Sequence, residues 1–445
     1  MTLRKVFTLF LCLLLAAYLI AGPYLLYRHR VDYRKSYDYR KQTQSAWNGV
    51  ITLWDFPRLD TRNGTRFSWI KSKISQFEKK NPGVYIEFRE LDWKTGPTTL
   101  KAAANTGANP DIAPVGSDFF YTSKGVLEEL DEYITPEERS DYLENALDTA
   151  CYNGKLYGLP WMMNGYTLLL NKGMFEEKGV QLPTDGNWTY EQFTEALKVL
   201  TYDTNGKGGP DVYGFTSFIE PGYYNIFGLL MCDGGQLFDP ETGKYQFDYP
   251  EALSGLKRLC SLKKDLKVTP PSFGTMTENE AWSAFLNGKV AVYTGGSWSV
   301  PYLRNLQGNY NIDFSVANFP TGKSDVPLSI KGTTCSYGVF KQTDPAKREK
   351  CIEFIKFLTS RDTQNELVNF GYFPVRKSGE NLYENDKEMY TIQQSLKFAD
   401  PLPKLANWEE IDIILQSRIK AAVNGEISPE QALSDAKDQI ERHLR

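Results

Sequence analysis

Histidine comes first among the residues that could do chemistry, because most nucleophilic and metal-dependent catalysis uses it. The 445-residue chain contains two histidines, His29 and His443, which lie near its two ends. The body of the chain therefore cannot form a Ser–His–acid or Cys–His catalytic arrangement or a histidine-ligated metal site. Carboxylate chemistry, such as glycoside hydrolysis by a pair of acids, needs no histidine and stays open.

The cysteines and the net charge exclude further classes of protein. None of the six cysteines forms a C-x-x-C pair, and five lie in the body, an odd number that argues against a disulfide framework. A single bridge, such as Cys232 with Cys260, stays open. The net charge is −4, and residues 1–45 hold eight Lys/Arg against two Asp, so the remainder carries about −10. An acidic body lacks the basic surface that nucleic acid binding requires.

One aromatic residue stands in an unusual setting. In "GKVAVYTGGSWSVPYL", an apolar strand ends at two glycines and Trp298 follows at the start of a helix. Glycines allow a sharp turn and a close approach to the backbone. A flat amphipathic ring at such a turn fits either a core position at a strand–helix junction or a platform for a ligand.

The elements that would position these residues alternate between strands and helices. The length exceeds what one core usually supports, so two lobes are expected. A strand at Gly49–Arg58, a helix at Ser68–Lys80 and a strand at Val84–Leu91 form a β-α-β pattern, which predicts parallel strands covered by helices. Further predicted features are the apolar strand Thr167–Leu170, helix starts at Thr189, Asp344 and Ser428, and a last helical stripe of Leu433, Ala436, Ile440 and Leu444.

The N-terminus predicts a membrane segment. Val6–Tyr27 is a run of 22 residues without a charge, enough to span about 30 Å of hydrocarbon. No small-x-small cleavage site ends it, which favours an uncleaved transmembrane helix over a cleaved signal segment within residues 1–27. Residues 28–46 then form a juxtamembrane stalk. Because Lys and Arg are more frequent after the span than before it, the loop charges alone would place the body inside the cell.

Seven blocks in order carry a family resemblance. They begin with "ITLWDF" and "NPDIAPVGSDFF", continue with "GKLYGLPWMMNGYTLLLNKGMFEEKGV" and "NWTYEQFTEALKVLT", and end with "FLNGKVAVYTGGSWSVPYL", "GYFPVRKS" and "NGEISPEQALSDAKDQIERHL". From about residue 49 onward the chain thus resembles the extracellular solute-binding proteins of bacterial ABC importers, specifically the carbohydrate-binding family that includes maltodextrin-binding protein.

The resemblance implies a fold, a function and partners. The fold is the α/β periplasmic-binding-protein type, with a cleft between lobe one (47–163 plus 330–372) and lobe two (164–329 plus 373–445). The function is capture of a sugar, expected to be an oligosaccharide, by hinge closure and delivery to the permease subunits of an ABC importer. The body is then an extracytoplasmic, membrane-anchored monomer that catalyses no reaction. Two other functions stay open: a sugar-sensing co-receptor for a membrane kinase, and a carboxylate-based carbohydrate-active enzyme.

The resemblance also implies ligand-binding residues. Trp298 matches a ring that stacks on sugar in the family, and Asp55 and Asp118 match positions that bond sugar hydroxyls. Asn164 and Tyr166 fall in the first crossover, where the maltodextrin branch has an acid in place of Asn164, so a different hydroxyl pattern is expected.

Other candidates follow from position. Arg376 lies in the third crossover, and the further aromatic candidates are Trp54, Trp93, Tyr223 and Trp408. Some relatives carry a calcium loop where this chain has Asp203, Asn205 and Asp211. Because Lys207 stands at a ligand position, we expect a plain turn there and no metal or other cofactor.

Overall fold

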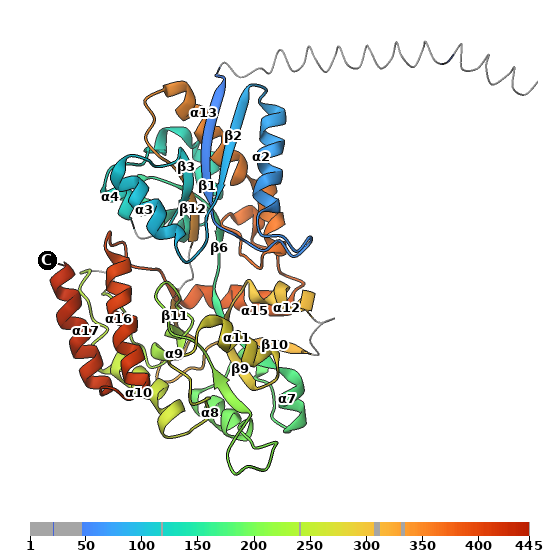
Figure 1. Ribbon diagram of the computed structural model, residues 1–445, viewed down its shortest axis with the longest axis vertical. Coiled ribbons are helices and arrows are strands. Elements are labelled where there is room, and N and C mark those ends of the chain that lie inside the picture. The colour runs from blue at the N-terminus through green and yellow to red at the C-terminus, as the bar shows by residue number, and fades with distance from the viewer. Residues whose placement is uncertain are drawn as a thin grey trace, which may run out of the picture.

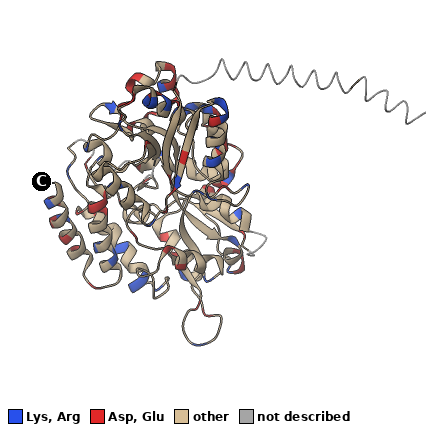
Figure 2. Cartoon of the chain, turned by 45° about the horizontal axis from the view of Figure 1, so that its top comes forward, with Lys and Arg blue, Asp and Glu red and all other residues tan. Residues whose placement is uncertain are grey.

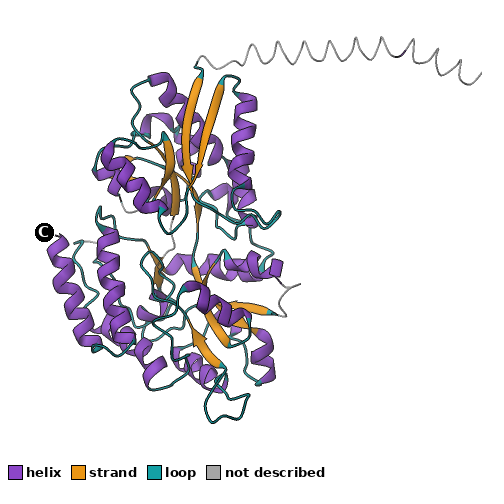
Figure 3. Ribbon diagram, in the orientation of Figure 1, coloured by secondary structure: helices purple, strands orange, loops and turns teal. Residues whose placement is uncertain are grey.

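The computed structural model describes Ala21 and residues 47–116, 119–239, 242–306, 312–330 and 334–444. The described chain forms two α/β lobes, drawn one above the other in Figure 1 and coloured by secondary structure in Figure 3. Lysine, arginine and acidic residues are interspersed over both lobes (Figure 2). The predicted membrane segment lies outside the described residues apart from Ala21, and no helix of the described part is long and apolar enough to cross a membrane.

The sheet of lobe one has five strands in the order β2-β1-β3-β12-β6. Strands β1, β2 and β3 are parallel, and β12 runs antiparallel to both β3 and β6. The predicted β-α-β unit is confirmed, with slightly earlier strand ends. The strands are β1 (Gly49–Asp55), β2 (Val84–Glu90), β3 (Ile112–Val115), β6 (Leu159–Met163) and β12 (Thr334–Val339).

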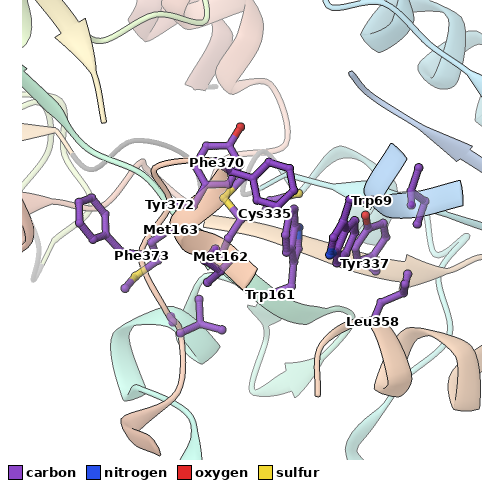
Figure 4. Packing of buried hydrophobic residues seen from close by; sticks show 14 of the residues in the cluster. Trp69, Trp161, Met162, Met163, Cys335, Tyr337, Leu358, Phe370, Tyr372 and Phe373 are labelled. Atoms are coloured by element: carbon purple, nitrogen blue, oxygen red, sulfur yellow. The ribbon is translucent and has the colours of Figure 1, made fainter. Parts of the chain in front are cut away.

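Helices cover this sheet and bury its apolar side chains. On β1 the alternate residues Ile51 and Leu53 are fully buried, as the two-residue period of a strand requires. Trp161 of β6 stacks on Trp69 with ring centroids 4.8 Å apart (Figure 4). The helices of lobe one are α2 (Ser68–Lys80), α3 (Gly96–Thr106), α4 (Phe120–Ser123), α5 (Pro136–Asp141), α6 (Glu144–Asp148), α13 (Pro345–Leu358) and α14 (Arg361–Gln364), with a small hairpin of β4 (Cys151–Tyr152) and β5 (Lys155–Leu156).

Lobe two has a four-stranded sheet in the order β10-β7-β9-β8. Its strands are β7 (Tyr166–Asn171), β8 (Tyr213–Thr216), β9 (Val290–Gly296) and β10 (Phe314–Ala317). The predicted apolar strand Thr167–Leu170 is the buried centre of β7. The helices assigned to this lobe are α7 (Lys172–Glu177), α8 (Tyr190–Val199), α9 (Phe227–Leu230), α10 (Pro250–Lys264), α11 (Glu278–Leu286), α12 (Ser299–Leu306), α15 (Lys387–Ser395), α16 (Trp408–Val423) and α17 (Pro429–Leu444).

The predicted helix starts are confirmed by their caps. The Thr189 side chain accepts a hydrogen bond from the Gln192 backbone in a capping box, and Asp344 accepts one from Ala346. The Ser428 hydroxyl accepts one from the Gln431 backbone. Along the last stripe three residues are buried, whereas the fourth, Leu444, is 37% exposed near the helix end.

The chain passes between the lobes at three places. At the first passage two residues separate the end of β6 from the start of β7. The second passage follows β11 (Ser329–Ile330), which pairs with the later strand β13 (Ala399–Asp400). The third passage, predicted at residues 371–376, comes later, between Ser378 and α15. Phe373 pairs with Met163, Arg376 pairs with Tyr142 and Ser378 bonds Asp141, all on lobe one. Within the predicted lobe-two range 373–445, the described structure therefore packs the first few residues on lobe one.

Candidate functional site

Sheet topology brings two strand edges together. In lobe one, β1, β3 and β6 run parallel, so their carboxyl ends share one edge. In lobe two, β8 and β9 end beside the start of β7, because Gly296 pairs with Tyr166. Since only Asn164 and Gly165 separate β6 from β7, these two edges face each other across the junction of the lobes. In α/β proteins ligands bind outside the carboxyl ends of strands.

Trp298 lies at the lobe-two side of this junction and is half-buried. Its indole meets the ring of Tyr166 edge-on, with centroids 5.7 Å apart and planes at 76°. The ring folds back over Gly296, where an added Cβ would come within 2.1 Å of it. The glycine turn predicted from the sequence thus has a definite role: it leaves the space in which the Trp298 ring lies.

The loop that follows β8 forms another part of the lobe-two side of the junction. The Asn225 amide donates hydrogen bonds to the Ser217 hydroxyl (2.8 Å) and the Phe218 carbonyl (3.0 Å) within the loop, and to the Thr294 hydroxyl of β9 (3.3 Å). The loop presents Tyr223, which packs edge-on against Phe218 and donates a hydrogen bond to Glu278 at 3.1 Å. We call Tyr166, Tyr223 and Trp298 the aromatic wall.

Three acids lie beside the aromatic wall. Glu278 is the first residue of α11, Glu220 belongs to the loop after β8, and Asp412 lies in α16. Burial raises the pKa of the Glu278 carboxyl, and the charge of Glu220 raises it further. Burial also raises the pKa of Asp412 to about 6. We call Glu220, Glu278 and Asp412 the acidic group. The acidic group was not predicted from the sequence. Only the Thr277 helix cap marks the region of Glu278, and a cap does not show which way the next residue faces.

Asn164, in the first crossover, has an unused acceptor. Its Oδ1 atom is shielded from solvent and has no hydrogen-bond partner among the described residues. The next residue, Gly165, accepts a hydrogen bond from the Ser297 backbone (2.8 Å), which ties the crossover to the turn that carries Trp298. Tyr166 thus contacts Trp298, and Asn164 precedes the residue that bonds the Trp298 turn.

Asp55 lies on the lobe-one side of the junction. It is fully buried, and both of its carboxylate oxygens accept hydrogen bonds. Its carboxylate accepts hydrogen bonds from Arg58 (2.8 Å), from the Phe56 backbone (2.8 Å) and from the Tyr337 hydroxyl (2.8 Å). The Arg58 guanidinium also lies over the Trp161 ring at 5.0 Å. Asp55 thus bonds three groups at the end of β1. Arg58, which balances its charge, was not predicted from the sequence.

Two further predicted residues, Arg376 and Trp408, are buried and hydrogen-bonded to other side chains. Arg376 is buried in lobe one, where it bonds Asp141 (3.2 Å) and the Tyr142 hydroxyl (3.0 Å). Trp408 is 3% exposed and donates its indole N–H to the Tyr224 hydroxyl at 2.8 Å. Asp118 lies outside the described residues.

Two predicted tryptophans of lobe one, the half-buried Trp54 of β1 and the exposed Trp93, make contacts near the end of β1. Trp54 lies under the Arg89 guanidinium at 4.2 Å. Trp93 is 53% exposed, stacks on Phe56 with centroids 4.5 Å apart, and donates to the Pro57 carbonyl at 3.0 Å. Neither contacts a member of the aromatic wall in these interactions.

The loop considered for calcium uses its oxygens internally. Asp203 accepts hydrogen bonds from three backbone N–H groups of the turn, and Asp211 accepts two from Thr204, which lower the pKa of Asp211 to about 2. In the described part of the chain no three His, Cys, Asp or Glu side chains are grouped closely enough to hold a metal ion. All five described cysteines, Cys232 and Cys260 included, are free thiols.

Fold and site define a two-lobe α/β protein whose strand edges meet at the lobe junction. The sequence profile of the bacterial extracellular solute-binding proteins matches residues 73–391. The chain belongs to this family, and the predicted resemblance is confirmed.

Three individual proteins are similar to this chain over most of its length. A putative binding protein of Brucella abortus (strain 2308) is 26% identical over 86% of this chain and 91% of its own length. The galactooligosaccharide-binding protein of Bacillus subtilis is 23% identical over 84% of this chain and 86% of its own. The maltotriose-binding protein of Pyrococcus abyssi is 26% identical over 68% and 64%.

Solved structures share the fold. An ABC transporter solute-binding protein of Thermotoga lettingae, bound to α-D-tagatose, has a TM-score of 0.76 at 24% identity and covers 89% of this chain and 100% of its own. A Listeria monocytogenes ABC substrate-binding protein in complex with cycloalternan has a TM-score of 0.75 at 22% identity, with coverage of 89% and 99%. The two-lobe fold predicted from the sequence is therefore confirmed.

Proposed function

We propose that this protein is an extracytoplasmic saccharide receptor that captures its ligand between the two lobes and delivers it to an ABC importer. The observation that carries the proposal is the aromatic wall, held at the lobe-two strand edge by the Gly296 turn. Sugar rings have an apolar C–H face and a rim of hydroxyls, so they match a flat ring bordered by polar acceptors.

The polar groups beside the wall fit this chemistry. The Asn164 Oδ1 atom is an acceptor without a protein donor, and a sugar hydroxyl would supply one. Glu278, bonded to Tyr223, offers a second acceptor. The relatives named for maltotriose and galactooligosaccharide binding support a saccharide, and an oligosaccharide in particular.

Ligand capture would use the hinge between the two lobes, with the residues around Arg376 belonging to lobe one. A ligand that contacts both lobes favours their closed arrangement by its differential affinity for that state. We further propose that the permease recognises this closed form. Residues 1–27 would anchor the protein, with residues 28–46 as a stalk before lobe one. The body would act as a monomer and would catalyse no reaction.

The test uses the full-length chain in a detergent without a sugar headgroup. Tryptophan fluorescence and thermal unfolding are followed against maltose, maltotriose, galactooligosaccharides and tagatose. We expect at least one saccharide to shift both signals, and Trp298→Ala to abolish the shift while remaining folded. Tyr85→Ala, which removes an exposed ring (61%) on the outer face of β2, is the matched control and should bind normally.

The proposal fails if no saccharide shifts either signal in the folded wild-type protein. If a saccharide binds and Trp298→Ala binds it equally well, the receptor function stands and the aromatic wall is not its binding surface.

A further inference from the structure

The buried aspartates of the described chain differ in whether a basic side chain balances their charge. Six aspartates of the described chain are buried, and five of them have an Arg or Lys nitrogen within hydrogen-bonding distance of the carboxylate. The five pairs are Asp55 with Arg58, Asp60 with Arg62, Asp111 with Lys347, Asp141 with Arg376 and Asp233 with Arg258, at 2.8 to 3.2 Å. The sixth, Asp412, is 2% exposed and forms no ion pair among the described residues.

Asp412 is held by neutral groups. Its carboxylate accepts a hydrogen bond from the Gly222 backbone (2.6 Å) and another from the Gln416 amide (2.9 Å). The same amide donates to the Tyr223 carbonyl (2.9 Å), so Gln416 lies between Asp412 and the aromatic wall. Gln416 is 1% exposed, and its Oε1 atom has no hydrogen-bond partner among the described residues. The Gln416 oxygen is therefore an unused acceptor beside Asp412 and the Tyr223 backbone.

The other two members of the acidic group are also without a basic partner. Glu278 bonds the Tyr223 hydroxyl, and neither Glu278 nor Glu220 forms an ion pair in the described part of the chain. Across the junction, the positive charge of Arg58 is already balanced by Asp55. Glu220 and Glu278 lie close enough for the charge of one to raise the pKa of the other, and Tyr223 contacts Glu278. With the buried Asp412 on the other side of the Gly222 turn, these carboxylates leave negative charge without a basic partner where the ligand would bind.

The missing positive charge fits an organic cation better than a metal. Within the described residues no acidic side chains are grouped closely enough to coordinate a metal ion. An ammonium group instead needs separated acceptors and an aromatic face, and it brings three donors. Carboxylates, the Gln416 Oε1 atom and the Tyr223 ring are groups of these types.

We infer that the saccharide bound by this protein carries a free amine, whose ammonium group lies between Glu220 and Glu278 against Tyr223, with Asp412 and Gln416 behind them. This inference rests on the proposed saccharide-receptor function. It specifies amino sugars with an unmodified amine, since N-acetylation removes the charge and two of the three N–H donors.

The test compares matched trisaccharides that differ only at one substituent of each ring: hydroxyl, free amine and N-acetylamine. Glucosamine trimer, N-acetylglucosamine trimer and cellotriose form the β-linked series, and the α-linked series with maltotriose as its neutral member is measured in parallel. Calorimetric titration of the full-length protein, in a detergent without a sugar headgroup, is done for the wild type and for Glu278→Gln, Asp412→Asn and Glu410→Gln. Glu410 is exposed, lies two residues before Asp412 and serves as the control.

We expect the amine-bearing sugar to bind at least about tenfold more tightly than its neutral and N-acetylated counterparts, because a charged hydrogen bond in a partly buried site contributes strongly to discrimination. Glu278→Gln and Asp412→Asn should each reduce that preference by about threefold or more, and Glu410→Gln should not change it.

Equal or tighter binding of the neutral sugars would overturn the inference and leave the receptor function standing. A preference for the amine that survives both substitutions would overturn the assignment to the acidic group. If no saccharide of any type binds, the proposed function fails and the inference fails with it.

Discussion

The indole of Trp298 lies over the backbone of Gly296, so that a methyl group at position 296 would come 2.1 Å from the ring. The residue that forms the platform and the residue that makes room for it are therefore a matched pair. Tyr166, whose ring meets Trp298 edge-on, pairs with Gly296 across the β7–β9 ladder. The geometry of the aromatic wall follows from the end of one strand and the start of its neighbour.

Substitution of Gly296 by alanine should displace the Trp298 ring without removing it. We expect a loss of about 1–3 kcal/mol in the free energy of unfolding, as for other overpacked positions, together with weaker saccharide binding. Urea unfolding and ligand titration measure the two effects. Gly209→Ala is the control, because an added Cβ there meets nothing within 4 Å. Wild-type binding by a folded Gly296→Ala variant would contradict the matched-pair interpretation.

Asp412→Asn should stabilise the protein above neutral pH. Burial raises the pKa of Asp412 to about 6 from its ordinary 3.8, so the native state binds this proton more readily than the unfolded state. The contribution of the group to stability therefore falls as pH rises from about 4 to about 6, by an upper limit of about 3 kcal/mol. The advantage of the asparagine variant should be largest at pH 7.5 and vanish at pH 4, measured by urea unfolding. Equal destabilisation at both pH values would instead mean that the two hydrogen bonds of the carboxylate dominate.

Arg58→Met should be strongly destabilising. Asp55 is fully buried and its charge is balanced by Arg58 at 2.8 Å, so removing the guanidinium leaves an unpaired buried charge at a cost of about 3–5 kcal/mol. Lys71→Ala, which breaks a pair with Glu90 whose two side chains are half-exposed, should cost less than about 1 kcal/mol. Chemical denaturation of both variants gives the comparison, and similar small losses for the two would exclude a structural role for the Asp55–Arg58 pair.

Polar contacts between the lobes should influence closure. Lys101 of α3 pairs with Glu409 of α16, Lys404 pairs with Asp148 at 2.6 Å, and Asn305 donates to the Thr61 carbonyl at 2.8 Å. Partly exposed pairs contribute about 0.2–1 kcal/mol each, so Glu409→Gln combined with Lys404→Ala should weaken ligand affinity by about two- to fivefold. Small-angle scattering without ligand should show a larger radius of gyration. An unchanged radius and affinity would mean that these contacts do not bias the hinge.

The sequence by itself determined the local elements and the family. The alternating pattern of β1, the caps at Thr189 and Asp344 and the apolar centre of β7 are properties of short stretches, and each has the predicted place in the structure. The two histidines near the chain ends excluded whole classes of catalysis before any fold was considered. Such features are local, so the physical rules for strands, helix caps and side-chain chemistry suffice to find them.

Only the tertiary structure decided which way the individual side chains face. Arg376 and Trp408 occupy segments predicted to contribute to the site, yet their partners, Asp141 and Tyr224, are 235 and 184 residues away in the chain and hold them in the interior. Glu278 carries no signal in the sequence and lies beside Tyr223 because α11 and the loop after β8 meet in space. A side chain's direction at a strand or helix end is set by packing between distant segments, and this packing is what a local sequence pattern does not contain.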